Sequence, residues 1–143
     1  MPELRTFTWQ TDTSEADLPE DRFSDHVNNA RYFHFINQCF QGWYRAMGIR
    51  GGVPGYSAAM ARTEYDFVRQ VRPPSRIRVR IEVVRVGRTS IEHAVEIADL
   101  GVDGRASAVV AGRGRVVHVW VERARARAEP WPPEVLAKCW DAG

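Results

Sequence analysis

The sequence contains no apolar run long enough to cross a membrane and no leader typical of a secreted protein. Its apolar stretches stay well below the roughly 18 residues of a membrane-spanning helix. Residues 1–5 do not place a basic segment before an apolar one, as a signal peptide does. These absences predict a cytoplasmic protein with no membrane partner.

Cysteine is also scarce, with only Cys39 and Cys139 in the chain. Both lie in apolar helical patterns and they do not form a C-x-x-C pair, which fits a cytoplasmic protein. The histidines His34, His93 and His118 lack the spacing of metal ligands. We therefore expect no metal site.

A large excess of charge of one sign is missing as well. The net charge is only +2, and Lys138 is the only lysine among the basic residues. Codon bias is the plainest explanation for the many arginines, and phosphate binding through the bidentate guanidinium is the alternative. The basic stretch 76–82 alternates arginine with aliphatic residues and offers no aromatic stacking platform, so we expect no nucleic-acid partner.

The remaining composition is that of an ordinary globular domain. The chain has 143 residues, of which 44% are hydrophobic and 27% are charged. A chain of this length can bury most of a core of its own. The sequence shows no internal repeat and no low-complexity linker, so it predicts one domain over residues 1–143.

The longest helical pattern follows a short polar segment and predicts a central helix that ends near Gly48. Asn28 or Asn29 can cap its first turn, because the side-chain oxygen accepts a hydrogen bond from an unpaired N–H. Apolar residues then recur at spacings of three and four: Tyr32, Phe35, Ile36, Cys39, Phe40, Trp43 and Met47. Phe33 and Tyr44 add apolar surface on other sides, so we expect a helix buried nearly all round.

The rest of the chain reads as strands. Alternation and β-branched residues predict strands at 4–11, 56–68, 76–86, 90–97 and 105–122, with a short helix at 133–140. The phase slips at 84–86, which predicts a bulge, and the last strand should kink near Gly112 and Gly114. Residues 12–25 read as a long loop, and 123–127 as a solvated charged run.

The fold class predicted by these elements is α+β, with an antiparallel sheet of about five strands that curls around one long central helix. One helix cannot cover both faces of such a sheet. The open face or edge should therefore pack against a second copy of the chain.

Four stretches carry a family likeness. Residues 26–32 (H-V-N-N-A-R-Y) match an H-V-N-N-x-x-Y element, and residues 87–90 match a G-R-T-S turn. Residues 64–75 are similar to E-Y-x-x-x-V-x-x-G-D, with Pro74 and Ser75 in place of Gly-Asp, and residues 131–134 are similar to a C-terminal Pro-x-Glu segment. Through these stretches nearly the whole chain resembles the hotdog-fold acyl-CoA thioesterases of the 4-hydroxybenzoyl-CoA thioesterase type.

The resemblance implies a sheet wrapped around a central helix, dimers with active sites at the subunit interface, and often tetramers. It also implies hydrolysis of a fatty or aromatic acyl-CoA with neither a metal nor an organic cofactor.

One part of the family pattern is altered. The family usually has D-x-D-x-x-G before H-V-N-N, with a catalytic Asp four residues before the His. Here Arg22 occupies that position and Asp25 replaces the Gly. The catalytic carboxylate therefore stays open among four residues, Asp12, Asp21, Asp25 and Glu64.

The catalytic candidates lie mostly at the start of the central helix. Unpaired N–H groups and the helix dipole at this end can stabilise the oxyanion of thioester hydrolysis. Asp25 is the first choice for base or nucleophile, with helix capping as its alternative role. The other catalytic candidates are His26, Asn28, Asn29 and Glu64; for them the alternatives are loop hydrogen bonds, capping and a solvated strand position.

The substrate-binding candidates are Tyr32, Arg88, Thr89 and Ser90. Tyr32 can equally be a core residue, and Thr89 and Ser90 can serve only the turn. Arg88 is one of several arginines that can bind the CoA phosphates.

The predicted function is thus hydrolysis of an acyl-CoA, the substrate partner, to free acid and CoA by a homodimer or homotetramer. The alternative is a non-catalytic protein that binds acyl-CoA, which the altered Asp pattern favours. A hotdog dehydratase is a weaker third reading, because only the spacing of Asp21 and His26 fits its D-x-x-x-x-H signature.

Overall fold

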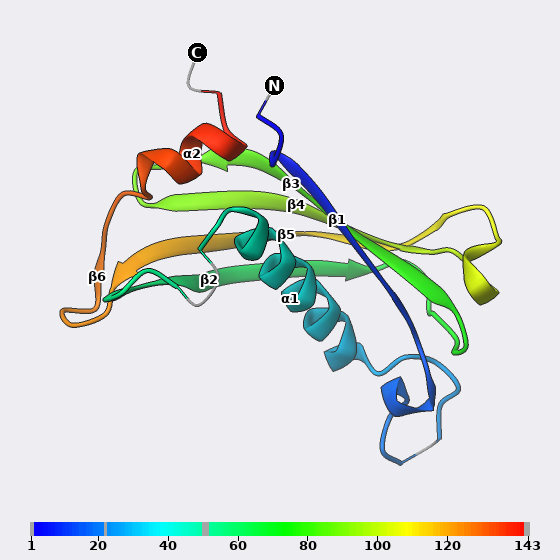
Figure 1. The fold of residues 1–143 in the computed structure, drawn as a ribbon. Helices are drawn as coiled ribbons and strands as arrows, with labels where there is room; N and C mark the ends of the chain where they lie inside the picture. Colours follow the sequence, from blue (N-terminus) through cyan, green and yellow to red (C-terminus); the bar gives the residue numbers. More distant parts are fainter. Residues whose placement is uncertain (1, 22, 50–51, 142–143) are drawn as a thin grey trace.

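The protein is described here by a computed structural model that covers residues 2–21, 23–49 and 52–141 (Figure 1). In chain order the elements are β1 (Thr6–Asp12), the 3-10 helix η1 (Glu15–Asp17), α1 (Asn29–Ala46), β2 (Tyr56–Phe67), β3 (Arg76–Val86), β4 (Ser90–Asp99), the 3-10 helix η2 (Val102–Gly104), β5 (Val109–Glu122), β6 (Arg127–Ala128) and α2 (Pro133–Cys139).

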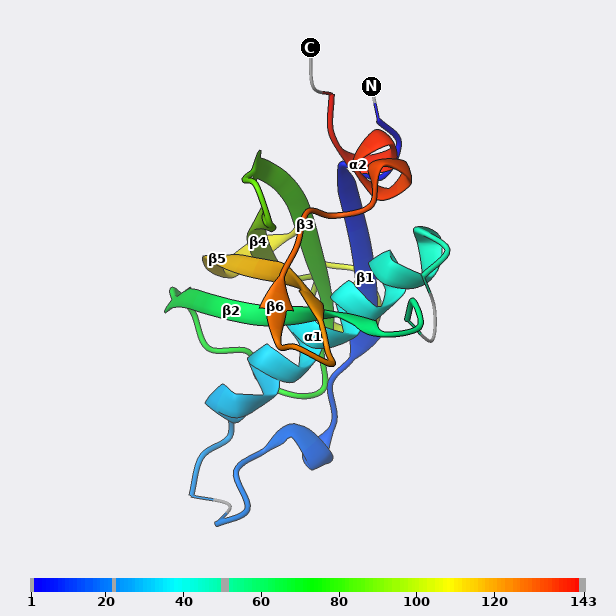
Figure 2. The same cartoon turned by 90° about the vertical axis from the view of Figure 1, so that its left-hand side faces the viewer.

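The strands form one curled antiparallel sheet in the order β1-β3-β4-β5-β2, and the two-residue β6 pairs with β5. The helix α1 lies across the concave face of this sheet, as both views show (Figures 1 and 2). The strands β1 and β2 are therefore the two edges. The predicted α+β class with a curled antiparallel sheet is confirmed.

Alternation along the strands determines which side chains meet the helix. In β3, Ile77, Val79, Ile81 and Val83 are fully buried, and the arginines between them lie on the outer face. The inner side chains pack with Tyr32, Phe35, Ile36, Phe40 and Trp43 of α1 into one core. The predicted bulge is present in β3, where the pairing with β4 shifts register between Val83 and Arg85.

The prediction that α1 is buried nearly all round is wrong. Its outer face exposes Asn37, Gln38 and Gln41, and the Phe33 side chain is 41% exposed. These polar residues recur at helical spacing, so they form one solvent-facing stripe opposite the apolar one. The helix begins after Asn28 and ends before Gly48, whose φ of 84° is the left-handed conformation expected of a terminating glycine.

Three short elements, η1, η2 and β6, fall where the sequence predicted no helix or strand. The segment 12–25 contains η1, and the charged run 123–127 turns the chain so that β6 can pair with β5. Among the described residues, no helix has the length and apolar character needed to cross a membrane.

Candidate active site at the start of helix α1

The start of α1 has an identifiable cap. Asn28 lies outside the helix with φ −58° and ψ 133°, and its Oδ1 accepts a hydrogen bond from the Ala30 N–H at 3.2 Å. The Asn28 carbonyl accepts the Arg31 N–H at 2.8 Å. In the described part of the chain the Asn29 N–H has no acceptor, so it is free to donate to a ligand oxygen.

Backbone hydrogen bonds from two other segments fix this helix start. The Asn28 N–H donates to the Asp17 carbonyl at 2.8 Å, and the Val27 N–H donates to the Val71 carbonyl at 2.8 Å. The Val71 N–H in turn donates to the Tyr32 hydroxyl at 3.2 Å. The first turn of α1 is therefore held between η1 and the connection from β2 to β3.

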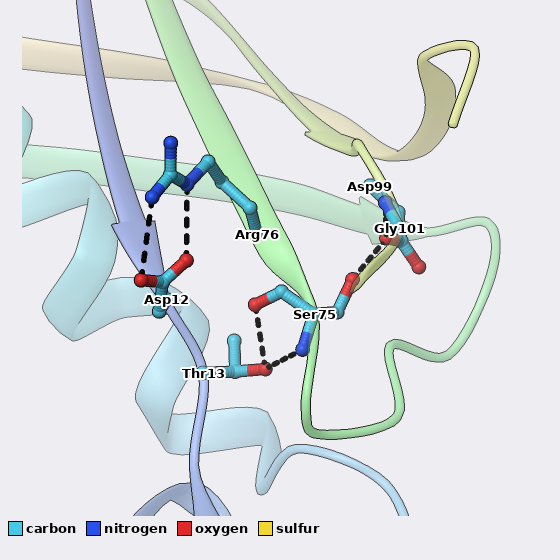
Figure 3. A network of polar contacts seen from close by, with 6 residues as sticks. All are labelled: Asp12, Thr13, Ser75, Arg76, Asp99 and Gly101. Carbon is cyan, nitrogen blue, oxygen red and sulfur yellow. Dashed lines mark hydrogen bonds and ion pairs between the residues drawn. The ribbon is translucent and has the colours of Figure 1, made fainter. Parts of the chain in front are cut away.

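A polar network holds the base of the long loop to the sheet (Figure 3). The Thr13 N–H and hydroxyl both donate to the Ser75 carbonyl, at 2.7 and 3.0 Å, and the Ser75 hydroxyl donates to Asp99. Ser75 stands where the family pattern has Asp, so this residue has a structural role here.

The same region contains the partner of the Asp12 carboxylate. Its carboxylate accepts hydrogen bonds from Arg76 at 3.0 and 3.4 Å, across the register pair of β1 and β3. The hydrogen bond from this guanidinium holds the pKa of Asp12 below its usual value. Asp12 is thus a partner of Arg76 at the sheet edge.

The other predicted carboxylates do not converge on the helix start. The Asp25 side chain is 77% exposed and one of its oxygens pairs with Arg72 Nε at 3.2 Å. Asp21 is exposed and accepts the Phe23 N–H at 3.1 Å. Glu64 pairs with Arg62 on the outer face of the sheet, because its neighbour Tyr65 points toward α1 and strand side chains alternate.

One carboxylate that sequence reasoning missed lies directly at the helix start. Asp17 is only 4% exposed, and its Oδ1 accepts a hydrogen bond from Arg31 Nε at 2.9 Å and forms an ion pair with Arg31 Nη2 at the same distance. Its Oδ2 accepts the Ser14 N–H at 2.8 Å, while Ser14 caps η1. The S-x-x-D spacing of this capping box was a signal in the sequence that could have pointed to Asp17.

An aromatic cluster adjoins the same end of α1. The Tyr32 ring is buried and lies 5.8 Å from Tyr65 and 5.4 Å from Phe67. Phe33 contacts Tyr65 at 6.2 Å, and both Phe33 and Phe67 are more than 40% exposed. Burial raises the pKa of Tyr32 and of Tyr65, so both phenols stay neutral. The cluster forms an apolar wall that is open to solvent on one side.

The predicted residues of the G-R-T-S turn lie far in space from the start of α1. Strand β3 runs from Arg76, near the helix start, to Val86, and its 11 residues span roughly 35 Å. The turn follows at the far end, where the Thr89 carbonyl accepts the Trp120 N–H at 3.1 Å and the Ser90 carbonyl accepts the Gly87 N–H at 2.8 Å. Arg88 is exposed there.

The remaining candidates have local contacts. His26 Nδ1 lies 3.1 Å from the Val27 carbonyl, and Asn29 is exposed on the first turn of α1. Arg22, which replaces the usual Asp, lies outside the described residues. Within the described ranges, no three His, Cys, Asp or Glu side chains are grouped to hold a metal ion.

Taken together, the geometry offers one free N–H donor for an oxyanion and a nearby apolar wall. A groove of about 330 Å³ lies beside the helix start, between β1, η1 and the outer side of α1, and is lined in part by Trp9, Asp17, Arg31 and His34. A carbonyl oxygen placed at the N-terminus of α1 would meet the free N–H of Asn29 and the positive end of the helix dipole.

Known structures share this fold. The PA2801 protein of Pseudomonas aeruginosa aligns with a TM-score of 0.81 at 21% identity, over 92% of this chain and 95% of that one. A 1,4-dihydroxy-2-naphthoyl-CoA thioesterase from Synechocystis gives 0.79 at 16% identity, over 94% and 96%. A hypothetical protein from Staphylococcus aureus, solved in complex with CoA, gives 0.79 at 9% identity, over 93% and 80%.

A search of curated proteins by sequence found no match. The family model described as the thioesterase-like superfamily, in contrast, matches residues 8–139, which is nearly the whole chain and includes every element from α1 to α2. The chain therefore belongs to the thioesterase-like superfamily, in agreement with the hotdog acyl-CoA thioesterase resemblance of its sequence.

Proposed function

We propose that this protein, acting as one domain, hydrolyses the thioester of an acyl-CoA to the free acid and CoA. The carbonyl group of the substrate thioester would bind at the start of α1. The observation that carries the proposal is the free N–H of Asn29 on a helix start fixed from two sides. Water adds to the carbonyl carbon, the oxyanion accepts a hydrogen bond from the Asn29 N–H at the positive end of the helix dipole, and the C–S bond then breaks. One proton of the water ends on the CoA thiol.

Asp25 is the proposed general base. It lies three residues before the cap Asn28, and only one of its oxygens has a partner, the exposed guanidinium of Arg72. Asp17 has both oxygens occupied and is shielded from water, so its proposed role is to hold η1 against the helix start. His26, Asn28 and Asn29 would then orient the water and the substrate.

The acyl group would lie against the aromatic cluster of Tyr32, Phe33, Tyr65 and Phe67. Because this wall is open on one side, a second copy of the chain would complete the pocket. Such a homodimer, or a tetramer built from it, would also bring Arg88, Thr89 and Ser90 of one copy toward the helix start of the other. In a single chain these three residues lie too far away, and Glu64 faces the wrong side of the sheet.

The test is release of free thiol from a panel of fatty and aromatic acyl-CoAs. We expect turnover with at least one of them, and a loss of about 100-fold or more in kcat for Asp25→Ala, as removal of a general base gives. The matched control is Asp17→Asn, which should lower the unfolding temperature and keep most of the kcat of the folded enzyme. If Asp17→Asn removes turnover and Asp25→Ala does not, Asp17 is the base.

One observation favours a second function, binding without turnover. Every described carboxylate of the segment 12–25 that the sequence nominated already has a partner: Asp12 with Arg76, Asp21 with the Phe23 N–H, and Asp25 with Arg72. A protein that binds acyl-CoA tightly and releases no thiol from any acyl-CoA would have this second function.

A further inference from the structure

A second cavity lies at the opposite end of α1 from the candidate active site. Its volume is about 320 Å³, and its lining includes Gln41, Tyr44 and Arg45 from the last turns of α1. At 1.5 Å of rise per residue, these residues lie roughly 20 Å along the helix from Asn29. The cavity is therefore separate from the proposed reaction site.

The floor of the cavity is aromatic. Tyr56 at the start of β2 and Trp120 near the end of β5 stack with ring centroids 5.6 Å apart and an angle of 6° between their planes. Trp131 supports Trp120 from behind at 4.9 Å. Ile49 and Ala58 complete the apolar part of the lining. Because Trp120 is only 4% exposed, the ring or short apolar chain of a ligand would contact mainly Tyr56, Ile49 and Ala58, which this packing holds rigid.

The polar part of the lining is cationic. Arg45 and Arg123 both line the cavity, and no acidic side chain lines it among the described residues. Neither guanidinium has a hydrogen-bond or ion-pair partner in the described part of the chain. Two nearby carboxylates are already engaged, Glu129 with the Tyr56 hydroxyl at 3.3 Å and Glu122 with Arg125 at 4.0 Å. Glu129, and to a smaller extent Glu122, raise the pKa of Tyr56, so their negative charge reaches the cavity. They lie outside its lining, where the only charged side chains among the described residues are the two arginines, so the lining itself favours an anion.

The end of α1 does not oppose this charge preference. Free carbonyls at a helix C-terminus would repel an anion. Here the Trp43 and Tyr44 carbonyls accept the N–H groups of Met47 and Ile49, and Lys138 Nζ donates to the Met47 carbonyl at 2.9 Å. The Arg45 carbonyl likewise accepts the Gly48 N–H at 3.1 Å, so three of the last four carbonyls of α1 have donors, and Lys138 adds positive charge beside them.

We propose that this cavity is a second ligand site for a small carboxylic acid with an apolar ring or chain. The ring or chain would lie on the Tyr56–Trp120 floor, and the carboxylate would bridge Arg45 and Arg123, whose planar guanidinium groups suit bidentate binding. The volume lies at the lower end of the range for ligand pockets, which selects a small acid over a whole acyl-CoA. The site does not depend on whether the start of α1 is catalytic.

The first experiment locates the ligand. Crystals of the full chain are soaked with bromonaphthoate, and the anomalous signal of bromine is recorded. We expect a bromine peak beside the rings of Tyr56 and Trp120. A bromine peak found only near Asn29, or no peak at saturating ligand, would overturn the proposal.

The second experiment measures affinity in solution by calorimetry with naphthoate and with uncharged naphthamide. The double variant Arg45→Gln/Arg123→Gln should bind naphthoate about tenfold more weakly or worse, and the wild type should prefer naphthoate to naphthamide. The matched control Arg85→Gln/Arg105→Gln loses the same charge at two exposed arginines outside the cavity, and should bind like the wild type. Equal weakening in both double variants would show a nonspecific effect of net charge and would contradict the site.

Discussion

At the scale of single residues, two buried histidines stand out because they lack hydrogen-bond partners. His93 on β4 has no partner at either ring nitrogen in the described structure, and His118 on β5 has none at Nδ1. Their rings pack at 4.9 and 4.6 Å against Phe40, and His93 also lies 4.6 Å from Trp43. Burial lowers the pKa of His93 to about 3 and the pKa of His118 to about 4.

These two groups predict a specific loss of stability in mild acid. In the unfolded chain a histidine gains its proton near pH 6.5, whereas in the folded protein both stay neutral down to about pH 4. The unfolded state then binds more protons, so the free energy of unfolding falls as pH drops below 6.5. Each histidine contributes a slope of about 1.4 kcal/mol per pH unit. Urea unfolding between pH 7 and pH 4 measures this slope.

The control for this prediction is the double variant His93→Leu/His118→Leu. At pH 7 it should differ from the wild type by no more than about 1.5 kcal/mol, because unpaired polar groups are replaced by apolar ones of similar size. Below pH 6 it should lose less stability than the wild type. His34→Gln alters an exposed histidine and should keep the wild-type slope. An unchanged slope in the double variant would refute the role of the buried pair.

The site residues show which contacts could be predicted from the sequence and which could not. The cap Asn28 was predictable, because capping depends on a local hydrogen bond between neighbours in the chain. The partners of Asp17 and Asp25 were not, because Arg31 and Arg72 reach them only after the loop has folded. Asp25 was the favoured carboxylate because it lies close to the helix start in the sequence. In the structure, the carboxylate that is buried at the helix start is that of Asp17.

At the scale of elements, the glycines of β5 decide how closely β2 approaches it. Gly114 pairs with Tyr65, and a Cβ added to Gly114 would collide with the Glu64 carbonyl. A Cβ on Gly112 would collide with the Tyr65 ring and the Asp66 carbonyl. These positions allow the Tyr65 ring to lie over β5 and stack on Tyr32 of α1.

We predict that Gly114→Ala destabilises the protein by about 1–3 kcal/mol, since the obstacle is backbone and cannot rotate away. The tyrosine near-ultraviolet signal should change as well, because Tyr65 loses its place against Tyr32. Thermal unfolding and circular dichroism give both readouts. Arg113→Ala alters the neighbouring outward residue, which is exposed, and should cost well under 1 kcal/mol. Equal losses in the two variants would contradict the close-approach argument.

The elements themselves were largely predictable from periodicity. All five long strands have at least one end within a residue of the predicted one, because alternation places side chains such as Ile77, Val79 and Ile81 on one face. The two-residue β6 was missed, since its pairing depends on a turn and not on any apolar pattern. The burial of the outer face of α1 was predicted wrongly, because the apolar residues Phe33 and Tyr44 suggested burial on every side. The polar residues between them in the sequence form the solvent-facing stripe.

At the scale of the whole molecule, the two faces and two edges of the sheet differ in chemistry. The outer face carries ion pairs of opposite sign, Arg113 with Glu96 at 3.5 Å and Arg115 with Glu92 at 3.9 Å, and is well solvated. The β2 side exposes large apolar residues instead, namely Met60, Phe67 and Val68. An edge strand of 12 residues with such side chains is a template for pairing with another chain.

This contrast predicts that the second copy binds at the β2 edge, and that one charge there disrupts the assembly. Val68 follows β2 and its side chain is 61% exposed, so Val68→Glu should leave the fold intact and place a carboxylate in the interface. We expect the wild type to sediment as a dimer or tetramer at micromolar concentration and the variant as a monomer. The matched control is Val102→Glu, at an equally exposed valine on η2 (59%), which should keep the wild-type mass. A wild type that is monomeric, or a Val68→Glu variant that stays assembled, would place the interface elsewhere.

If the proposed active site needs the second copy, Val68→Glu should also lose thiol release in proportion to the monomer fraction, while Val102→Glu retains it.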